Sequence, residues 1–302
     1  GVISSTVNPF ATGIAAGFAG VSLGDGIGLR ILMWVVFEAV AIWYVMAYAA
    51  KVKKTPSASV VGRGHEELRT KAEEAPPLTT RRKVILAVFL ATFLLMTYAV
   101  VPFEDMGLSL PSLGWWFPEL SGLFLVSAII VGLIDRMEEA AIAEEFVTGA
   151  ADLLGVAFII GISRGITYLM NEGRITDTVL SWGENALSGA GPLTFILLVF
   201  LLYLPLSILI PSSSGLATLS IPIVAPLGKF AGVSGALIIT AFQSASGLVN
   251  LITPTAAVVM GALALGHVPY DKWVRFSWKI VLLFAALIAA FLVAGALLSG
   301  GS

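Results

Sequence analysis

The sequence predicts an all-α polytopic membrane protein, and three observations lead to this fold class. The chain has 302 residues, of which 58% are hydrophobic and only 12% are charged, whereas a soluble domain has about 25% charged residues. Its mean hydropathy is +0.96. Apolar runs of about 20 residues recur, which is the length that a helix needs to cross a bilayer. Because these runs are continuous blocks without alternation, they exclude a transmembrane β-barrel.

The composition also limits the chemistry of the chain. It has no cysteine, which excludes disulfides, thiolate metal sites and cysteine nucleophiles. His65 and His267 are too few for a histidine-rich metal site. The net charge of −2 favours no class of partner, because the charges are concentrated in loops. We therefore expect a lipid bilayer around the chain, no cofactor and no nucleic-acid partner.

The first 83 residues divide into a broken segment, a span and a linker. An apolar stretch to about Leu23 is interrupted by polar residues, and a continuous span follows over about Leu29–Ala50, so residues 1–50 form the end of a first repeat. Residues 51–83 hold nine of the seventeen Lys and Arg residues. Loops rich in Lys and Arg stay on the cytoplasmic side of the membrane. The sequence therefore predicts a cytoplasmic linker over residues 51–83.

The topology of residues 84–302 follows from the position of this linker. Val84–Phe103 runs outward and Leu120–Ile134 returns. Glu138–Ala151 is amphipathic with four glutamates and is expected to lie on the inner surface. Leu153–Met170 then runs outward, and a polar stretch from Asn171 to Gly191 is expected outside.

The remaining residues predict a hairpin, a broken helix and a last span. An apolar run ends at Pro211 and three serines, and a shorter apolar run follows, so we expect a re-entrant hairpin over about 192–228 that enters from outside. Two complete spans are the alternative, although the second run is short for that. A broken helix over about 233–265 and a last span over about 272–298 place the C-terminus outside.

The two ends of the chain share one order of features. A shift of 245 residues superposes Pro9 on Pro254 and Arg30 on Arg275 without a gap. Each copy has polar residues beside a proline, a half-helix of small residues, a polar turn and a long span. The first turn is expected outside and the second inside, so the copies are inverted; chance similarity is the alternative. Inverted repeats with interrupted helices indicate a secondary transporter with a site near the middle of the membrane.

The repeat also predicts an N-terminally truncated chain. About 165 residues, Val84 to Val249, precede the break in the second copy, but about seven precede it in the first. If the two halves match, about 160 residues that include a first hairpin are missing before Gly1. We expect such a fragment not to transport by itself.

The break at Asn250–Thr255 is the centre of the predicted site. Pro254 lacks an N–H and disfavours helix at Thr253, and backbone groups freed in a membrane must face protein, water or ligand. The side-chain oxygens suit a monovalent cation such as Na⁺, and the N-terminus of the next half-helix favours an anion. An ordinary proline kink is the alternative. The proposed substrate ligands are Asn250, Thr253, Pro254 and Thr255 with Asn8, Pro9 and Thr12, and the proposed cation ligands are Ser5, Asn8, Ser244, Ser246, Asn250 and Thr253.

The hairpin tip is the second candidate site. Its residues offer hydroxyls, a close backbone approach and the N-terminus of an arm that begins at Leu216, which together can bind an anion. A simple polar loop at the surface is the alternative. The tip consists of Ser212, Ser213, Ser214 and Gly215.

Two charged residues lie deep in apolar spans. Glu38 could be a carboxylate that couples transport to protons, and Arg164 could bind a substrate carboxylate, because charges inside a membrane are costly and usually functional or paired. The alternative for each is a structural ion pair or hydrogen bond with a neighbouring helix. H⁺ and Na⁺ both stay open as the coupling ion.

Other function classes fit less well. The serine-rich segments are similar to those of intramembrane serine proteases, but such a nucleophile needs a base within hydrogen-bond reach. His267 lies about 20 residues beyond Ser246, which is about 30 Å along a helix. An enzyme is therefore not expected. A channel is the other alternative, but broken inverted repeats favour alternating access.

The motifs resemble those of a known family. The likeness extends over essentially the whole chain, and it is most specific in the two site motifs. The matching segments are Leu209–Ala217 (LIPSSSGLA), Gln243–Thr255 (QSASGLVNLITPT), Ser163–Ile166 (SRGI) and Gly173–Thr178 (GRITDT), with Asn8–Thr12 (NPFAT) as the first-repeat counterpart. They resemble the YfcC-like branch of the C4-dicarboxylate anaerobic carrier group, which is similar to the divalent anion/sodium symporters of the ion transporter superfamily.

The resemblance implies a scaffold domain, a mobile transport domain and homodimers that move substrate by an elevator motion. It implies Ser212–Gly215 as the hairpin tip and Ser246, Asn250, Thr253 and Thr255 as the broken-helix site. Related symporters have a Ser-Asn-Thr tip, from which the Ser-Ser-Ser tip departs, so the resemblance does not fix a dicarboxylate as the substrate. We expect a cation-coupled secondary transporter for a small carboxylate-bearing metabolite, namely a C4-dicarboxylate, an amino acid or a short peptide. The alternative is a substrate/product antiporter such as a basic amino-acid exchanger.

Overall fold

The computed structural model describes most of the chain as helices. It describes all residues except 1, 7, 23, 62–76, 101–102, 104–108, 116 and 300–302, and it leaves out the side chains of 9, 10, 100, 117, 155, 156, 159, 160, 163, 164, 166, 167, 171 and 299. Two compact units are present, and each is considered separately. One comprises Gly1–His65 with Leu153–Ser302, and the other comprises Glu66–Asp152.

The described residues confirm the predicted class of all-α polytopic membrane protein. They contain helices and no strand, and five of the helices are long and apolar enough to cross a membrane. These are Ile27–Lys54, Thr80–Ala99, Pro118–Asp135, Pro192–Leu209 and Tyr270–Leu298.

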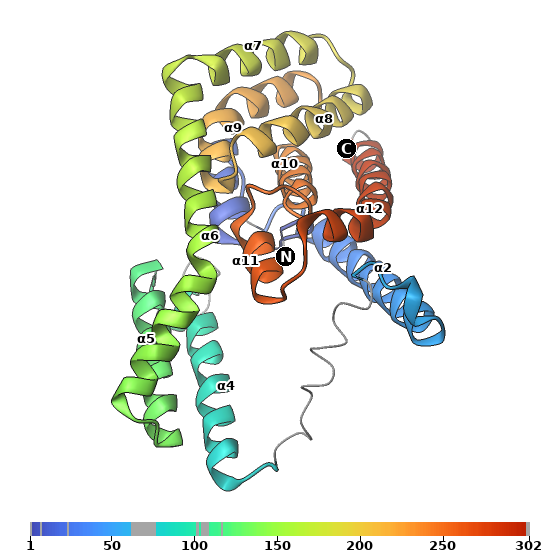
Figure 1. The fold of residues 1–302 in the computed structure, drawn as a ribbon. Coiled ribbons are helices and arrows are strands. Elements are labelled where there is room, and N and C mark those ends of the chain that lie inside the picture. Colours follow the sequence, from blue (N-terminus) through green and yellow to red (C-terminus); the bar gives the residue numbers. More distant parts are fainter. Residues whose placement is uncertain are drawn as a thin grey trace. The chain divides into compact units, whose positions relative to one another are not determined.

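The N-terminal segment of the larger unit begins with short helical pieces (Figure 1). The π-helix η1 spans Pro9–Gly13, and α1 spans Ile14–Ala19. Gly20 then adopts a left-handed conformation (φ 67°), which costs a glycine little and ends α1. After a turn, α2 extends over Ile27–Lys54 with three lysines in its last turn, where positive charge is favourable. The short 3₁₀-helix η2 follows at Pro56–Ala58.

Helices of the C-terminal half make much of the core of this unit. α10 is the innermost of them, because every residue from Leu237 to Val249 on it is buried. It packs against α8, α9, α12 and α1. Its contact with α9 is close, since a Cβ at Gly228 would lie 2.1 Å from the Ile238 side chain. The helices are α7 (Ile175–Leu187), α8 (Pro192–Leu209), α9 (Ser213–Phe230), α10 (Gly235–Val249), α11 (Ala257–Leu265) and α12 (Tyr270–Ser299).

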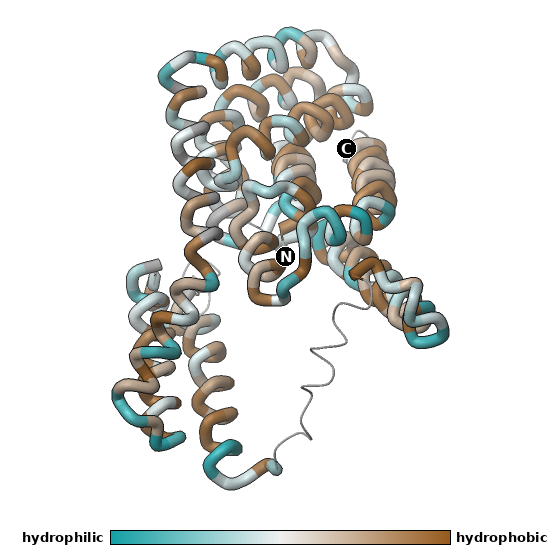
Figure 2. The backbone as a smooth tube through the Cα atoms, in the orientation of Figure 1, coloured by the Kyte–Doolittle hydropathy of each residue, from teal (hydrophilic) through white to brown (hydrophobic). Residues whose placement is uncertain are grey.

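The long helices α2 and α12 pair with each other. The rings of Phe37 and Phe284 meet edge to face with centroids 4.8 Å apart, a favoured aromatic arrangement. Tyr44 donates a hydrogen bond to the carbonyl of Phe276 on α12. The apolar colouring of both helices in Figure 2 agrees with their assignment as spans.

The smaller unit contains a helical hairpin. α4 (Thr80–Val100) and α5 (Phe117–Asp135) are antiparallel, because Arg81 at the start of α4 contacts Asp135 at the end of α5 at 3.2 Å. Near their middle, the hydroxyls of Thr92 and Ser127 are 2.9 Å apart. The helix that follows, α6, spans Glu139–Glu172 and continues into the larger unit.

Three boundaries differ from the sequence-based expectations. Glu138–Ala151 and Leu153–Met170 were expected as separate elements, but α6 runs through both, since no proline or turn motif separates them. The polar stretch Asn171–Gly191 contains α7, whose buried residues recur every three or four positions. The second arm of the hairpin begins at Ser213, three residues before Leu216, because Ser212 caps it.

Several predictions stay open. α8 has the length of a complete span, so the interpretation of residues 192–228 as a re-entrant hairpin stays a prediction. The cytoplasmic assignment of the linker also stays a prediction, and residues 62–76 of it lie outside the described residues.

Candidate functional site

The predicted break in the C-terminal half is present. α10 ends at Val249, residues 250–256 are not helical, and α11 begins at Ala257. Thr253 is buried, with 4% of its surface exposed, whereas Pro254 is exposed. The hydroxyl oxygens of Thr253 and Thr255 are 2.8 Å apart. Two hydroxyls therefore meet in the break, as oxygen ligands of one small ion or polar group would.

Side chains of α12 satisfy two carbonyls of this break. The Trp273 indole N–H donates to the carbonyl of Leu251 at 2.7 Å, and the Tyr270 hydroxyl donates to the carbonyl of Ile252. Because a carbonyl without a donor is costly in a membrane, these contacts stabilise the non-helical backbone. The break is thus held by α12, the second helix after it.

Asn250 lies at the start of the break. It caps the C-terminus of α10 with helical dihedral angles, and its N–H donates to the carbonyl of Ser246 at 3.0 Å. Its side chain is half-buried, and within the described part of the chain it makes no hydrogen bond. The amide group is therefore available to bind a ligand.

The N-terminal counterpart is also a buried, irregular segment. Ser4, Ser5 and Thr12 have at most 7% of their surface exposed. The Asn8 side-chain oxygen accepts from the N–H of Ala11 at 3.2 Å, which caps the short helix η1. Pro9 is the first residue of η1, but its side chain lies outside the described set.

A polar cluster joins this first break to α10. The Thr12 hydroxyl donates to Oε1 of Gln243 at 2.7 Å, and Nε2 of Gln243 donates to the carbonyl of Ser5 at 2.8 Å. The Ser244 hydroxyl donates to the carbonyl of Ile3 at 2.7 Å. Gln243, Ser244 and Thr12 have no exposed surface. This cluster fixes the first break against the helix that leads into the second break.

A glycine permits the close approach of the two segments. A Cβ at Gly247 would lie 2.3 Å from the backbone nitrogen of Ile3, closer than any real Cβ contact. Only glycine fits there without moving the backbone. Ser246, one residue earlier, is buried on the same helix.

The proposed hairpin tip forms the first turn of α9. Ser212 is the N-cap, and its hydroxyl oxygen accepts from the N–H of Gly215 at 3.2 Å. The hydroxyls of Ser212 and Ser214 are 3.3 Å apart. All four residues from Ser212 to Gly215 are half-buried. The turn thus places hydroxyls and the positive end of a helix dipole together.

The structure brings together only part of the predicted site. It joins Ser5 and Thr12 to Ser244 through the cluster around Gln243. Among the described residues, no hydrogen bond connects the Ser212–Gly215 turn with either break. Whether these elements bind one ligand stays a prediction.

Of the two charged side chains that the sequence places deep in apolar spans, the structure describes one. Glu38 is exposed on α2, and no described cation forms an ion pair with it. A structural ion pair for Glu38 is therefore absent from the described part of the chain. The Arg164 side chain lies outside the described set.

Three functional side chains were not identified from the sequence. Arg30 is the largest fully buried side chain, and its Nη2 lies 3.4 Å from the carbonyl of Thr6. Gln243 and Trp273 are the others. A signal for Gln243 was available, because Thr240, Gln243 and Gly247 follow the three- and four-residue spacing of one helix face.

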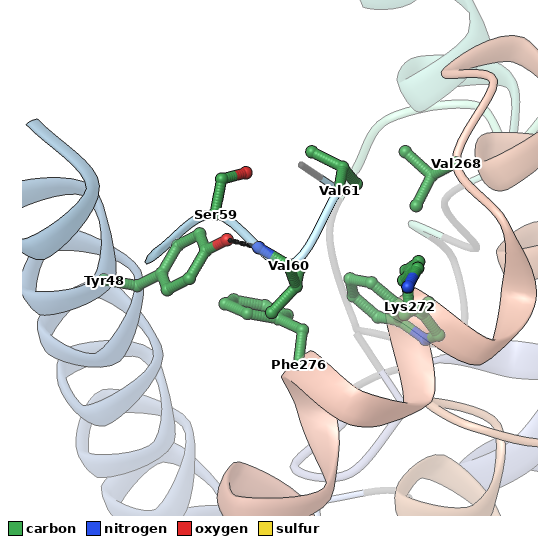
Figure 3. Close-up of a pocket in the computed structure, with 8 residues that line it drawn as sticks. Tyr48, Ser59, Val60, Val61, Val268, Lys272 and Phe276 are labelled. Carbon is green, nitrogen blue, oxygen red and sulfur yellow. Dashed lines mark hydrogen bonds between the residues drawn. The ribbon is translucent and has the colours of Figure 1, made fainter. Parts of the chain in front are cut away.

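A cavity of about 220 Å³ lies next to Trp273 (Figure 3). The residues after η2 line it, and the N–H of Val60 donates to the Tyr48 hydroxyl at 3.0 Å. The Trp273 and Phe276 rings also line it, and Figure 3 shows the Phe276 ring near Val60. The start of the linker therefore lines the same cavity as the aromatic residue that holds the second break.

The described residues contain no group of three or more His, Cys, Asp or Glu side chains that could hold a metal ion. The oxygens that could bind a cation are neutral hydroxyls, amides and carbonyls. Such a set fits a monovalent ion better than a divalent one, which takes carboxylate ligands.

Comparisons with known proteins give consistent results. Residues 1–297 match the family model described as C4-dicarboxylate anaerobic carrier. An uncharacterized protein of Haemophilus influenzae is 34% identical over 287 residues, which cover 93% of this chain and 54% of that protein. A putative basic amino acid antiporter of Escherichia coli, YfcC, is 30% identical over 314 residues, which cover 99% of this chain and 60% of that protein. The chain thus spans a little over half the length of these relatives. No solved structure matches.

Proposed function

Because the chain belongs to the C4-dicarboxylate anaerobic carrier family, we propose that it acts in secondary active transport of a small carboxylate-bearing metabolite across the cytoplasmic membrane. The chain is a multi-pass membrane protein of a carrier family. The substrate class, the coupling ion, the elevator motion and the homodimer belong to the proposal.

One observation supports the proposal most directly. The two irregular segments related by a shift of 245 residues are both polar and each has buried hydroxyls, at Ser4, Ser5 and Thr12 in the first and at Thr253 in the second; the first packs on the helix that leads into the second. Non-helical backbone at membrane depth is tolerated where it is buried in protein or lines a water-filled cavity. Discontinuous helices in inverted repeats hold substrate and ions in secondary transporters.

The neutral oxygens of the breaks support Na⁺ as the coupling ion, with H⁺ as the alternative. Ser5, Thr253 and Thr255 offer hydroxyls, and Asn250 offers an amide oxygen. The Ser212–Gly215 turn is suited to a carboxylate, because it places serine hydroxyls at the N-terminus of α9.

The test is uptake into proteoliposomes by the natural protein, with any residues that its gene places before Gly1. Labelled C4-dicarboxylates, basic amino acids and short peptides are offered with and without an inward Na⁺ gradient. Gradient-dependent uptake of one of these classes is expected. Failure to take up any of them under either a Na⁺ or an H⁺ gradient would contradict the proposal.

Exchange is the second candidate, because the similar Escherichia coli protein is named as a putative basic amino acid antiporter. An exchanger requires counter-substrate inside the vesicle, whereas a symporter requires the ion gradient. Vesicles loaded with arginine or with buffer distinguish the two. Coupling to protons is tested with Glu38→Gln, which removes coupling if Glu38 carries the proton, while Asn250→Ala removes it if Na⁺ binds at the break.

A further inference from the structure

Two backbone carbonyls at equivalent places in the repeat have side-chain donors. The carbonyl of Thr6 lies three residues before Pro9, and the carbonyl of Leu251 lies three residues before Pro254. The two positions differ by 245, which is the shift that superposes the prolines. Both carbonyls lie just before their proline, where the chain is not helical.

The donors lie at the same position in their helices, although the shift of 245 that superposes the prolines pairs Arg30 with Arg275 and not with Trp273. Arg30 Nη2 lies 3.4 Å from the carbonyl of Thr6, and Trp273 Nε1 lies 2.7 Å from the carbonyl of Leu251. Arg30 is the fourth residue of α2, which begins at Ile27, and Trp273 is the fourth residue of α12, which begins at Tyr270. In each copy, the long helix after the half-helix thus reaches back to the break.

The surroundings show why these donors matter. Arg30 has 1% of its surface exposed, and burial of a charge is costly unless the charge is hydrogen-bonded. Trp273 is half-buried, and Tyr270 adds a second donor at the neighbouring carbonyl of Ile252. Arg275 and Trp278 on α12 have the same side-chain types as Arg30 and Trp273, but both are exposed.

We propose that Arg30 and Trp273 are positioning residues, each of which holds one of the two breaks in the conformation that binds ligand. Arg30 and Trp273 donate hydrogen bonds to backbone carbonyls of the breaks. The side-chain hydroxyls and amides of the breaks, including those of Asn250 and Thr253, are left for the ligand. The two positioning residues act through the backbone and do not touch the substrate. The part of this inference that concerns substrate rests on the proposed transport function.

The two donors differ in charge, which makes the paired breaks unequal. A buried guanidinium holds the first break, and a neutral indole holds the second.

The experiment compares matched variants of the natural protein. Trp273→Phe removes the N–H and keeps an aromatic ring, with Trp278→Phe as its control. Arg30→Met removes the charge at similar length, with Arg275→Met as its control and Arg30→Lys as the conservative variant. Hydrogen–deuterium exchange of residues 3–13 and 250–257 is measured in detergent, and KM and kcat are measured for uptake.

The expected result is local to each break. Trp273→Phe speeds hydrogen–deuterium exchange in residues 250–257 about three- to tenfold, because it removes one hydrogen bond. It raises KM by a similar factor with little change in kcat. Arg30→Met does the same for residues 3–13, and Arg30→Lys restores part of the protection. Both controls behave as the wild type.

Three outcomes would overturn the inference. These are unchanged exchange in the two segments, equal effects of the control variants, or a fall in kcat alone with KM unchanged. If the natural protein transports none of the offered substrates, the proposed function fails, but the exchange measurement still decides the role of the two residues.

Discussion

Replacement of Gln243 by leucine tests the polar cluster that joins the first break to α10. The substitution keeps the volume of the side chain but removes its two hydrogen bonds, to Thr12 at 2.7 Å and to the Ser5 carbonyl at 2.8 Å. Thr12 keeps a partner, because its hydroxyl oxygen lies 3.2 Å from the Ser5 hydroxyl. The Ser5 carbonyl loses the donor that Gln243 supplies.

The magnitude follows from these contacts. Hydrogen bonds between membrane helices contribute about 0.6 kcal/mol on average, which is the expected loss at Thr12. A buried carbonyl left without a donor costs about 1–3 kcal/mol. Gln243→Leu is therefore expected to lower the free energy of unfolding by about 2–4 kcal/mol.

The assay is reversible unfolding in mixed micelles, followed by circular dichroism. A double-mutant cycle with Thr12→Val separates the pair from its surroundings, and a coupling energy of about 0.5–1.5 kcal/mol is expected. If Gln243→Leu unfolds within about 0.5 kcal/mol of the wild type, or if the two substitutions are additive, the cluster does not hold the segments together.

Three further substitutions have definite expectations. Gly247→Ala should break the contact with the first break, since its Cβ would lie 2.3 Å from the Ile3 nitrogen, and should lower the free energy of unfolding in the same micelle assay by several kcal/mol. Gly122→Ala is the control that should be tolerated, because nothing lies within 4 Å of its Cβ. Ser212→Ala removes the N-cap of α9 and should cost about 1 kcal/mol, and thermal midpoints equal to the wild type would contradict that role. Ser207→Ala should be neutral or stabilising in thermal unfolding, because within the described residues the buried Ser207 hydroxyl has no partner; a clear loss of stability would reveal a partner.

The membrane class and the second break could be predicted from local sequence. The apolar blocks specify spans because length and hydropathy alone decide membrane insertion. Pro254 with its polar neighbours marks a break, since proline removes a donor and displaces the preceding residue from the helix. The start of α9 was placed three residues late, because the capping role of Ser212 went unrecognised. The sequence also did not suggest that α7 forms, although its buried positions Thr176, Leu180, Gly183 and Leu187 have helical spacing.

The contacts that hold the site could not be predicted in this way. Gln243 lies 231 residues from Thr12, and nothing in the local pattern of either segment indicates the other. Trp273 and Tyr270 look like ordinary interfacial aromatics at the start of a span. Their role as donors to the break depends on the backbone geometry of residues 251 and 252, which only the fold provides.

The bond between Thr12 and Gln243 has a consequence for biosynthesis. At about 5–20 residues per second, the ribosome needs about 12–46 seconds to add the 231 residues between them. During that interval Ser5 and Thr12 have no partner on α10, although α2 has already been made. The contact that fixes the first break can form only after α10 has been synthesised.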